Sequence, residues 1–75
     1  MTLDEWKKEI NNCYYGGQLA RLVINACTNK QQELPASKTE RNELRITFCT
    51  RARQVGCGAT EAMVKKYANQ ILTTI

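Results

Sequence analysis

Cysteine is the residue type in this chain with the widest chemical repertoire. Four cysteines occur, at positions 13, 27, 49 and 57, no two of them form a Cys-x-x-Cys pair, and there is no histidine. Structural zinc sites draw their ligands from closely spaced pairs of cysteine and histidine, so this spacing argues against a metal site. We therefore expect no metal and no cofactor, and we interpret Cys13, Cys27 and Cys49 as small buried apolar side chains.

Cys57 differs from the other three because it lies between Gly56 and Gly58 at the predicted start of a helix. A helix N-terminus lowers the pKa of a thiol, and a glycine turn exposes it, which together are typical of a redox-reactive cysteine. We interpret Cys57 as a residue of the turn, and the sequence leaves a redox role open.

Other catalytic groups are scarce in the sequence. Without histidine the commonest general base is missing, and no base is evident beside any cysteine nucleophile. The carboxylates cluster near predicted helix starts, and "YYGGQ" lacks the lysine and Ser/Thr of a phosphate-binding loop. The sequence predicts a protein that is not an enzyme and has no small-molecule substrate.

The basic residues are concentrated in the second half of the chain. The net charge is +4, and residues 36–75 hold seven basic and three acidic side chains, whereas residues 1–35 hold four of each. Such a polarised charge favours an anionic partner, either nucleic acid or an acidic protein surface. The alternative is a solvated face that Glu40 and Glu43 partly neutralise. The candidate basic binding face comprises Lys38, Arg41, Arg45, Arg51, Arg53, Lys65 and Lys66.

Four helices would have to position these groups, over about residues 3–14, 18–29, 37–54 and 58–75. Two pairs of residues have the spacing of a capping box: Thr2 with Glu5, and Ser37 with Glu40. Gly16 and Gly17 are expected to end the first helix. The second has the widest apolar arc and is expected at the centre of the core. The sequence thus predicts one domain over residues 1–75, an all-α compact bundle.

One segment also fits a strand. "LRITFCTRA" alternates apolar and polar residues and is rich in β-branched side chains, and "ARLVINACT" is its only plausible partner. The alternative fold is therefore α+β, with a two-stranded hairpin formed by residues 19–28 and 44–52. The capping signal at Ser37 and the helical periodicity of residues 19–26 favour helices in both places.

Residues 51–67 have the layout of a DNA-binding helix-turn-helix, with Gly56 as the turn glycine and Ala52 four positions earlier. The second helix of that motif needs an apolar residue nine positions after the glycine, and this chain has Lys65 there. A DNA-binding regulator that uses residues 51–67 is consequently the second hypothesis for the function.

The last predicted helix has an apolar half that continues to the final residue. Because so short a chain can bury only a limited surface, we expect this side to be covered by a second protein or a second copy. Ile46, which falls on the opposite side of its helix from Leu44 and Phe48, supports a partner too. The candidate interface comprises Val64, Ala68, Ile71, Leu72 and Ile75.

The start of the chain lacks the order of a secretory signal, and no apolar run is long enough to cross a bilayer. We therefore expect a cytoplasmic protein without membrane contact. The first hypothesis is a small regulatory protein that binds another protein, of the type with which phages and mobile elements antagonise a transcriptional repressor or defence factor. That last association rests on the size of the chain.

Overall fold

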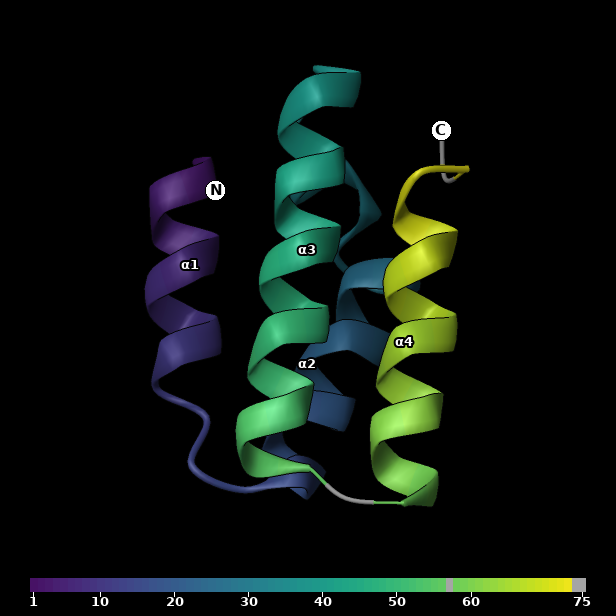
Figure 1. The fold of residues 1–75 in the computed structure, drawn as a ribbon. Coiled ribbons are helices and arrows are strands. Elements are labelled where there is room, and N and C mark those ends of the chain that lie inside the picture. Colours follow the sequence, from purple (N-terminus) through teal and green to yellow (C-terminus); the bar gives the residue numbers. More distant parts are fainter. Residues whose placement is uncertain (57, 74–75) are drawn as a thin grey trace.

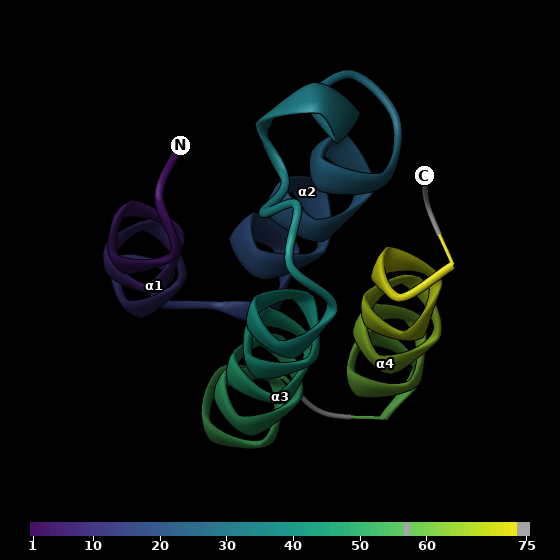
Figure 2. The same cartoon turned by 90° about the horizontal axis from the view of Figure 1, so that it is seen from above.

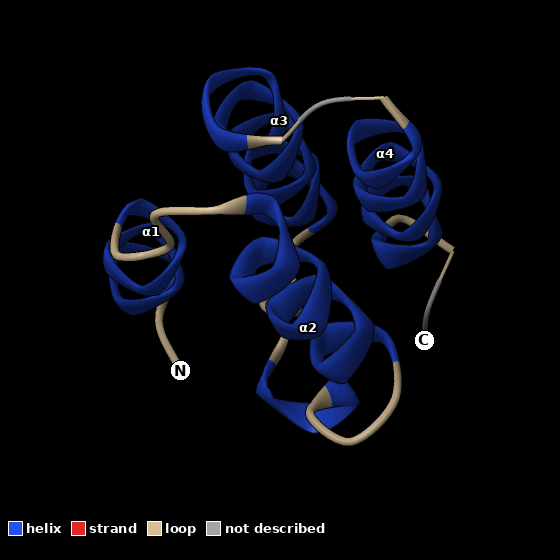
Figure 3. Ribbon diagram, turned by 90° about the horizontal axis from the view of Figure 1, so that it is seen from below, coloured by secondary structure: helices blue, strands red, loops and turns tan. Residues whose placement is uncertain are grey.

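The computed structural model describes residues 1–56 and 58–73, and these form helices joined by loops (Figures 1 and 3). The elements are α1 (Leu3–Asn11), α2 (Gly16–Cys27), the 3-10 helix η1 (Gln31–Glu33), α3 (Lys38–Val55) and α4 (Ala59–Ile71). The all-α prediction is confirmed. The α+β alternative is wrong, since residues 19–28 and 44–52 belong almost entirely to α2 and α3 and no described residue lies in a strand.

The four α-helices alternate in direction along the chain, which is the up-down-up-down topology of a simple bundle. Figures 1 and 2 show α3 between α1 and α4, with α2 packed behind them. α3 contacts α1, α2 and α4. The prediction that the second helix lies at the centre of the core is supported by its burial: among the described helices α2 supplies the most buried residues, Leu19, Ala20, Val23, Ala26 and Cys27, while Leu22 and Ile24 are only partly buried.

Both predicted N-caps are present. The Thr2 hydroxyl accepts from the Glu5 N–H (3.2 Å) and the Glu5 carboxylate accepts from the Thr2 N–H (2.9 Å), a complete capping box that also lowers the pKa of Glu5. Ser37 caps α3 by accepting from the Glu40 N–H. The expectation for Gly16 and Gly17 is wrong, because they open α2 instead of ending α1.

The core runs the length of the bundle. The rings of Trp6 on α1 and Phe48 on α3 lie 6.4 Å apart, and the Trp6 indole N–H donates to the carbonyl oxygen of Glu33 (3.0 Å). The radius of gyration, 10.8 Å, is close to the value of about 11 Å typical of a folded chain of this length. The largest fully buried side chains come from all four α-helices: Trp6, Ile10, Leu19, Val23, Leu44, Phe48, Val64 and Ile71.

Gly16 is required where α2 begins against the α3–α4 connection. A Cβ at Gly16 would lie 2.7 Å from Cγ2 of Thr60. We expect Gly16→Ala to destabilise the fold by about 1–3 kcal/mol, the usual cost of overpacking, although alanine is the better helix former. Thr60→Ser removes the clashing methyl group, so the double variant should regain most of this loss. Urea unfolding of both variants measures it, and equal stability of Gly16→Ala and the parent would contradict the contact.

Candidate functional site

The apolar side of α4 lies inside the bundle. Val64, Ala68 and Ile71 are each 0% exposed and belong to the core shared with α2 and α3. Leu72 is half-buried, and Ile75 lies outside the described residues. The expectation that the chain leaves this side open is therefore wrong for Val64, Ala68 and Ile71, and the folded chain does not offer them to a partner.

Residues 51–67 form part of an antiparallel helical hairpin. Figures 1 and 2 show α3 and α4 side by side along their lengths. At the far end from the turn, Leu72 and Thr73 line the same cavity as Lys38 and Arg41. A DNA-reading helix-turn-helix needs two helices that cross steeply, so that one can enter a groove alone, and these helices do not.

Two residues of the predicted basic face bind backbone carbonyl groups. Arg51 points towards α1: its guanidinium donates to the carbonyl oxygens of Cys13 (2.8 and 3.1 Å) and Asn11 (3.2 Å). The Arg41 Nε donates to the carbonyl oxygen of Pro35 at the start of α3. Both arginines satisfy carbonyl groups at helix ends or loops, so the basic binding face loses Arg51, and Arg41 has a structural role.

The contacts of Arg51 yield a matched pair of variants. Arg51→Met removes charge-assisted hydrogen bonds to the end of α1 and should lower the free energy of unfolding by about 1.5–3 kcal/mol. Arg53→Met, at an exposed position two residues away, should change it by less than about 0.5 kcal/mol. Urea denaturation compares the two variants. Equal effects would show that the Arg51 contacts contribute nothing.

The remaining five basic residues all lie on the α3–α4 hairpin. Lys38, Arg45 and Arg53 follow one another at seven- and eight-residue spacing on α3, and Lys65 and Lys66 lie on α4. We call this group the basic hairpin face, defined by Lys38, Arg45, Arg53, Lys65 and Lys66.

The α3–α4 hairpin carries the whole charge excess of the chain. Its two helices hold seven basic residues and three acidic ones, Glu40, Glu43 and Glu61, while the four basic and four acidic residues elsewhere cancel. Glu61 pairs with Lys65 at 2.9 Å. Among the described residues, Lys38, Arg53 and Lys66 have no ion pair or hydrogen bond from their side chains. Glu43 pairs with Lys7 of α1, and both Glu40 and Glu43 are exposed on α3, so partial neutralisation by these two carboxylates stays the alternative explanation.

The cysteines differ in exposure. Cys13 and Cys27 are buried, as predicted, and burial raises the pKa of both thiols. The Cys13 thiol lies 3.4 Å from the carbonyl oxygen of Glu9, and the Cys27 thiol 3.1 Å from that of Tyr67. Cys49 is half-buried, not buried as predicted, and Cys57 lies outside the described residues. Protonated, hydrogen-bonded thiols are poor nucleophiles.

These surroundings predict slow alkylation of Cys27. In a Cys57→Ser background, Cys27 and Cys13 should react with iodoacetamide at least tenfold more slowly than Cys49, and all three at equal rates in urea. Because the folded chain keeps the Cys13 and Cys27 thiols protonated to a higher pH than the unfolded chain does, their burial contributes to the free energy of unfolding below the unfolded-state pKa of about 8.5. This contribution is lost as the pH rises through the raised pKa of the folded state. Mass spectrometry of the labelled chain measures the rates, and rapid labelling of Cys27 at pH 7 would contradict the burial.

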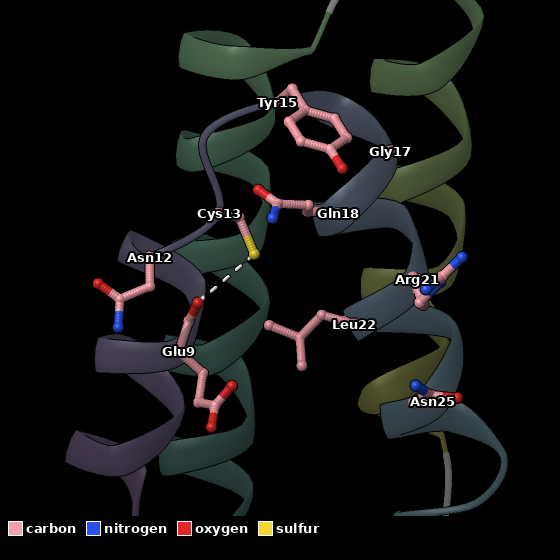
Figure 4. A pocket seen from close by; sticks show the side chains of 9 residues that line it. All are labelled: Glu9, Asn12, Cys13, Tyr15, Gly17, Gln18, Arg21, Leu22 and Asn25. Carbon is pink, nitrogen blue, oxygen red and sulfur yellow. Dashed lines mark hydrogen bonds between the residues drawn. The ribbon is translucent and has the colours of Figure 1, made fainter.

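An open cleft of about 500 Å³ separates α1 from α2 (Figure 4). Glu9 and Cys13 line one side of it, Leu22 and Gln18 reach towards them from α2, and Tyr15 lies at one end. Asn12, Gly17, Arg21 and Asn25 complete its lining.

Tyr14 and Tyr15 are the most exposed large apolar side chains in the described chain, at 74% and 61%. The backbone that carries them is held in place. The Tyr14 N–H donates to the Gln18 side chain (2.9 Å), and Arg51 binds the carbonyl oxygen of Cys13, the preceding residue. The Tyr15 ring lies against Gly17, where a Cβ would approach it to 3.3 Å. We call Tyr14, Tyr15 and the cleft beside them the tyrosine cleft.

This surface is not among the sequence-based predictions. Tyr14 belongs to the first predicted helix, residues 3–14, and the sequence predicts no binding role for either tyrosine. The sequence offers no signal for Tyr14, which lies four residues after Ile10 and therefore on the apolar stripe formed by Leu3, Trp6 and Ile10. Its exposure follows from the end of α1 at Asn11, three residues before it. Tyr15 lies off that stripe.

No known family model, curated protein or solved structure matches this chain. Within residues 1–56 and 58–73, no helix has both the length and the apolar character needed to span a bilayer. The same residues contain no cluster of three or more Cys, Asp or Glu side chains placed to hold a metal ion.

Proposed function

We propose that this chain is a non-enzymatic protein that acts by binding another protein, and that the tyrosine cleft is its contact surface. The observation that carries the proposal is the exposure of two adjacent tyrosines on a backbone held by its own hydrogen bonds. Tyrosine is enriched in protein interfaces and among the residues that dominate binding energy, because it combines a large apolar ring with a hydroxyl group.

Preorganisation strengthens this argument. A loop that is already ordered loses little conformational entropy when a partner binds. The backbone of Tyr14 is anchored through its own N–H, and the Tyr15 ring lies against Gly17, so the backbone of this loop needs no further ordering when a partner binds. Gln18 lies near Tyr15, and further along the cleft Leu22 provides an apolar contact and Asn25 a hydrogen-bonding group (Figure 4).

A protein of this kind would regulate its partner by covering a surface that the partner needs. An antagonist of a transcriptional repressor or of a defence factor works in this way, and the proposal includes that role. The partner surface should present an apolar side chain able to enter between α1 and α2, with polar groups around it.

Affinity capture from extracts of the cells that encode the chain tests the proposal. Three baits are compared: the parent, Tyr14→Ser/Tyr15→Ser, and Met63→Ser, which removes an exposed apolar side chain (37%) on α4. We expect one protein to be retained by the parent and by Met63→Ser, and to be reduced at least tenfold on the double tyrosine variant. Circular dichroism checks that all three baits are folded. Equal capture by all baits, or capture of nucleic acid alone, would contradict the proposal.

A further inference from the structure

The basic hairpin face is a second surface that the proposed function does not use. It belongs to α3 and α4, whereas the tyrosine cleft lies between α1 and α2 (Figure 4). It carries five of the eleven basic residues, on two helices whose net charge equals the +4 of the whole chain. A concentrated charge of this kind attracts an anionic partner and orients it on approach.

The spacing of the cations indicates the form of the partner. Lys38 and Arg45 are seven residues apart on α3, and Arg45 and Arg53 are eight apart. At 1.5 Å per residue these intervals are about 10.5 and 12 Å. A partner helix lying along the hairpin, with acidic residues at seven- or eight-residue intervals, presents its carboxylates at the same intervals.

Two details favour a protein over nucleic acid. Ile46 is 46% exposed and follows Asn42 by one helical turn on the same side of α3, so an apolar side chain lies among the cations. An apolar centre with a charged rim is the usual layout of a protein interface, whereas a phosphate backbone offers Ile46 no contact. None of the five residues that define the face, nor Ile46, is aromatic, so bases have no ring on which to stack.

Arg45 is bound by Asn42. Its Nε and one terminal nitrogen donate to the Asn42 side-chain oxygen, at 3.1 and 2.9 Å. This contact uses two of the five N–H donors of the guanidinium and leaves three on the terminal nitrogens, which can donate to a carboxylate. Lys38, Arg53 and Lys66 have no competing internal ion pair among the described residues.

We propose that the basic hairpin face binds an acidic amphipathic helix of a partner protein, with carboxylates over Lys38, Arg45 and Arg53 and an apolar side chain against Ile46. The chain thereby has two binding surfaces on different sides. This proposal does not depend on the tyrosine cleft, and each can fail without the other.

Selection from a displayed library of 21-residue helical peptides tests it. The bait is the full chain, and the counter-selection bait is the charge-reversed chain Lys38→Glu/Arg45→Glu/Arg53→Glu. These three positions are on the solvent side of α3, and circular dichroism verifies the fold of the variant. A second set of baits compares Ile46→Ser with Met63→Ser, another exposed apolar residue outside the face.

We expect enriched peptides to carry aspartate or glutamate at seven- or eight-residue spacing. Their affinity should fall at least tenfold on the charge-reversed chain and severalfold on Ile46→Ser, and stay unchanged on Met63→Ser. The same chains are titrated with a 20-base-pair DNA duplex in 150 mM salt. Enrichment without acidic bias, no enrichment over the charge-reversed bait, or tighter binding of the duplex than of the selected peptides would each overturn the proposal.

Discussion

Ile71→Asp should leave the chain unfolded at room temperature. Ile71 is completely buried between α4 and the rest of the bundle, and the described structure holds no basic side chain in its core to pair with a carboxylate. Burying an unpaired charge costs several kcal/mol, and a domain of 75 residues has a total stability on the order of 4–11 kcal/mol. Circular dichroism and urea unfolding measure the result directly.

Leu72→Asp is the matched control for that variant. Leu72 follows Ile71 directly, but it is half-buried at the end of α4, where a carboxylate can reach water. We expect a loss of about 1–2 kcal/mol and a folded protein, because only part of the side chain leaves apolar surroundings. A folded Ile71→Asp chain with the stability of Leu72→Asp would contradict the burial of the α4 apolar side.

Trp6→Ala should lower the free energy of unfolding by about 3–5 kcal/mol, the usual range for removing a buried aromatic side chain. The indole contributes in two ways. It packs against Phe48, which joins α1 to α3, and it donates to the Glu33 carbonyl oxygen, which anchors η1. Urea unfolding is followed by circular dichroism, because Trp6 is the only tryptophan and its loss removes the fluorescence signal.

Trp6→Phe separates the two contributions. It keeps most of the ring packing but leaves the carbonyl oxygen of Glu33 without the indole N–H, so we expect a smaller loss of about 1–3 kcal/mol. Equal effects of Trp6→Phe and Trp6→Ala would show that the hydrogen bond dominates. A loss below 1 kcal/mol for Trp6→Ala would contradict the packing of α1 onto the bundle.

Local sequence signals predicted the helices well, because the causes of helix formation are local. The Thr2–Glu5 capping box and the cap at Ser37 depend on residues three apart, and both are present. Apolar residues at helical spacing likewise mark one side of α3, where Leu44, Phe48 and Ala52 are fully buried and Val55 is partly buried.

Predictions that depended on which helix covers which surface were less successful. The apolar half of α4 was visible in the sequence, but its cover by α2 and α3 follows from tertiary packing. Arg51 was grouped with the basic face although it binds the end of α1, a contact between residues 38 apart. Gly16 and Gly17 were interpreted as a stop signal, while the close approach of Thr60 to Gly16 arises only when α2 packs beside α4.

Because the predicted interface residues on α4 are buried, the proposed binding function depends on exposed side chains elsewhere. The chain covers its own α4, and the side chains available to partners are the exposed tyrosines and the unpaired cations on another side. Two surfaces of different chemistry allow one small protein to contact two partners, or two regions of one partner, at the same time.

The central claim is that the bundle is complete as a single chain, so that its partners bind to exposed surfaces. The concentration dependence of unfolding tests this claim most directly. Urea unfolding, followed by Trp6 fluorescence at chain concentrations from 1 to 300 μM, should have the same midpoint throughout, because folding of a monomer does not depend on concentration. A midpoint that rises steadily with concentration would show that a second copy completes the core, and would contradict the account.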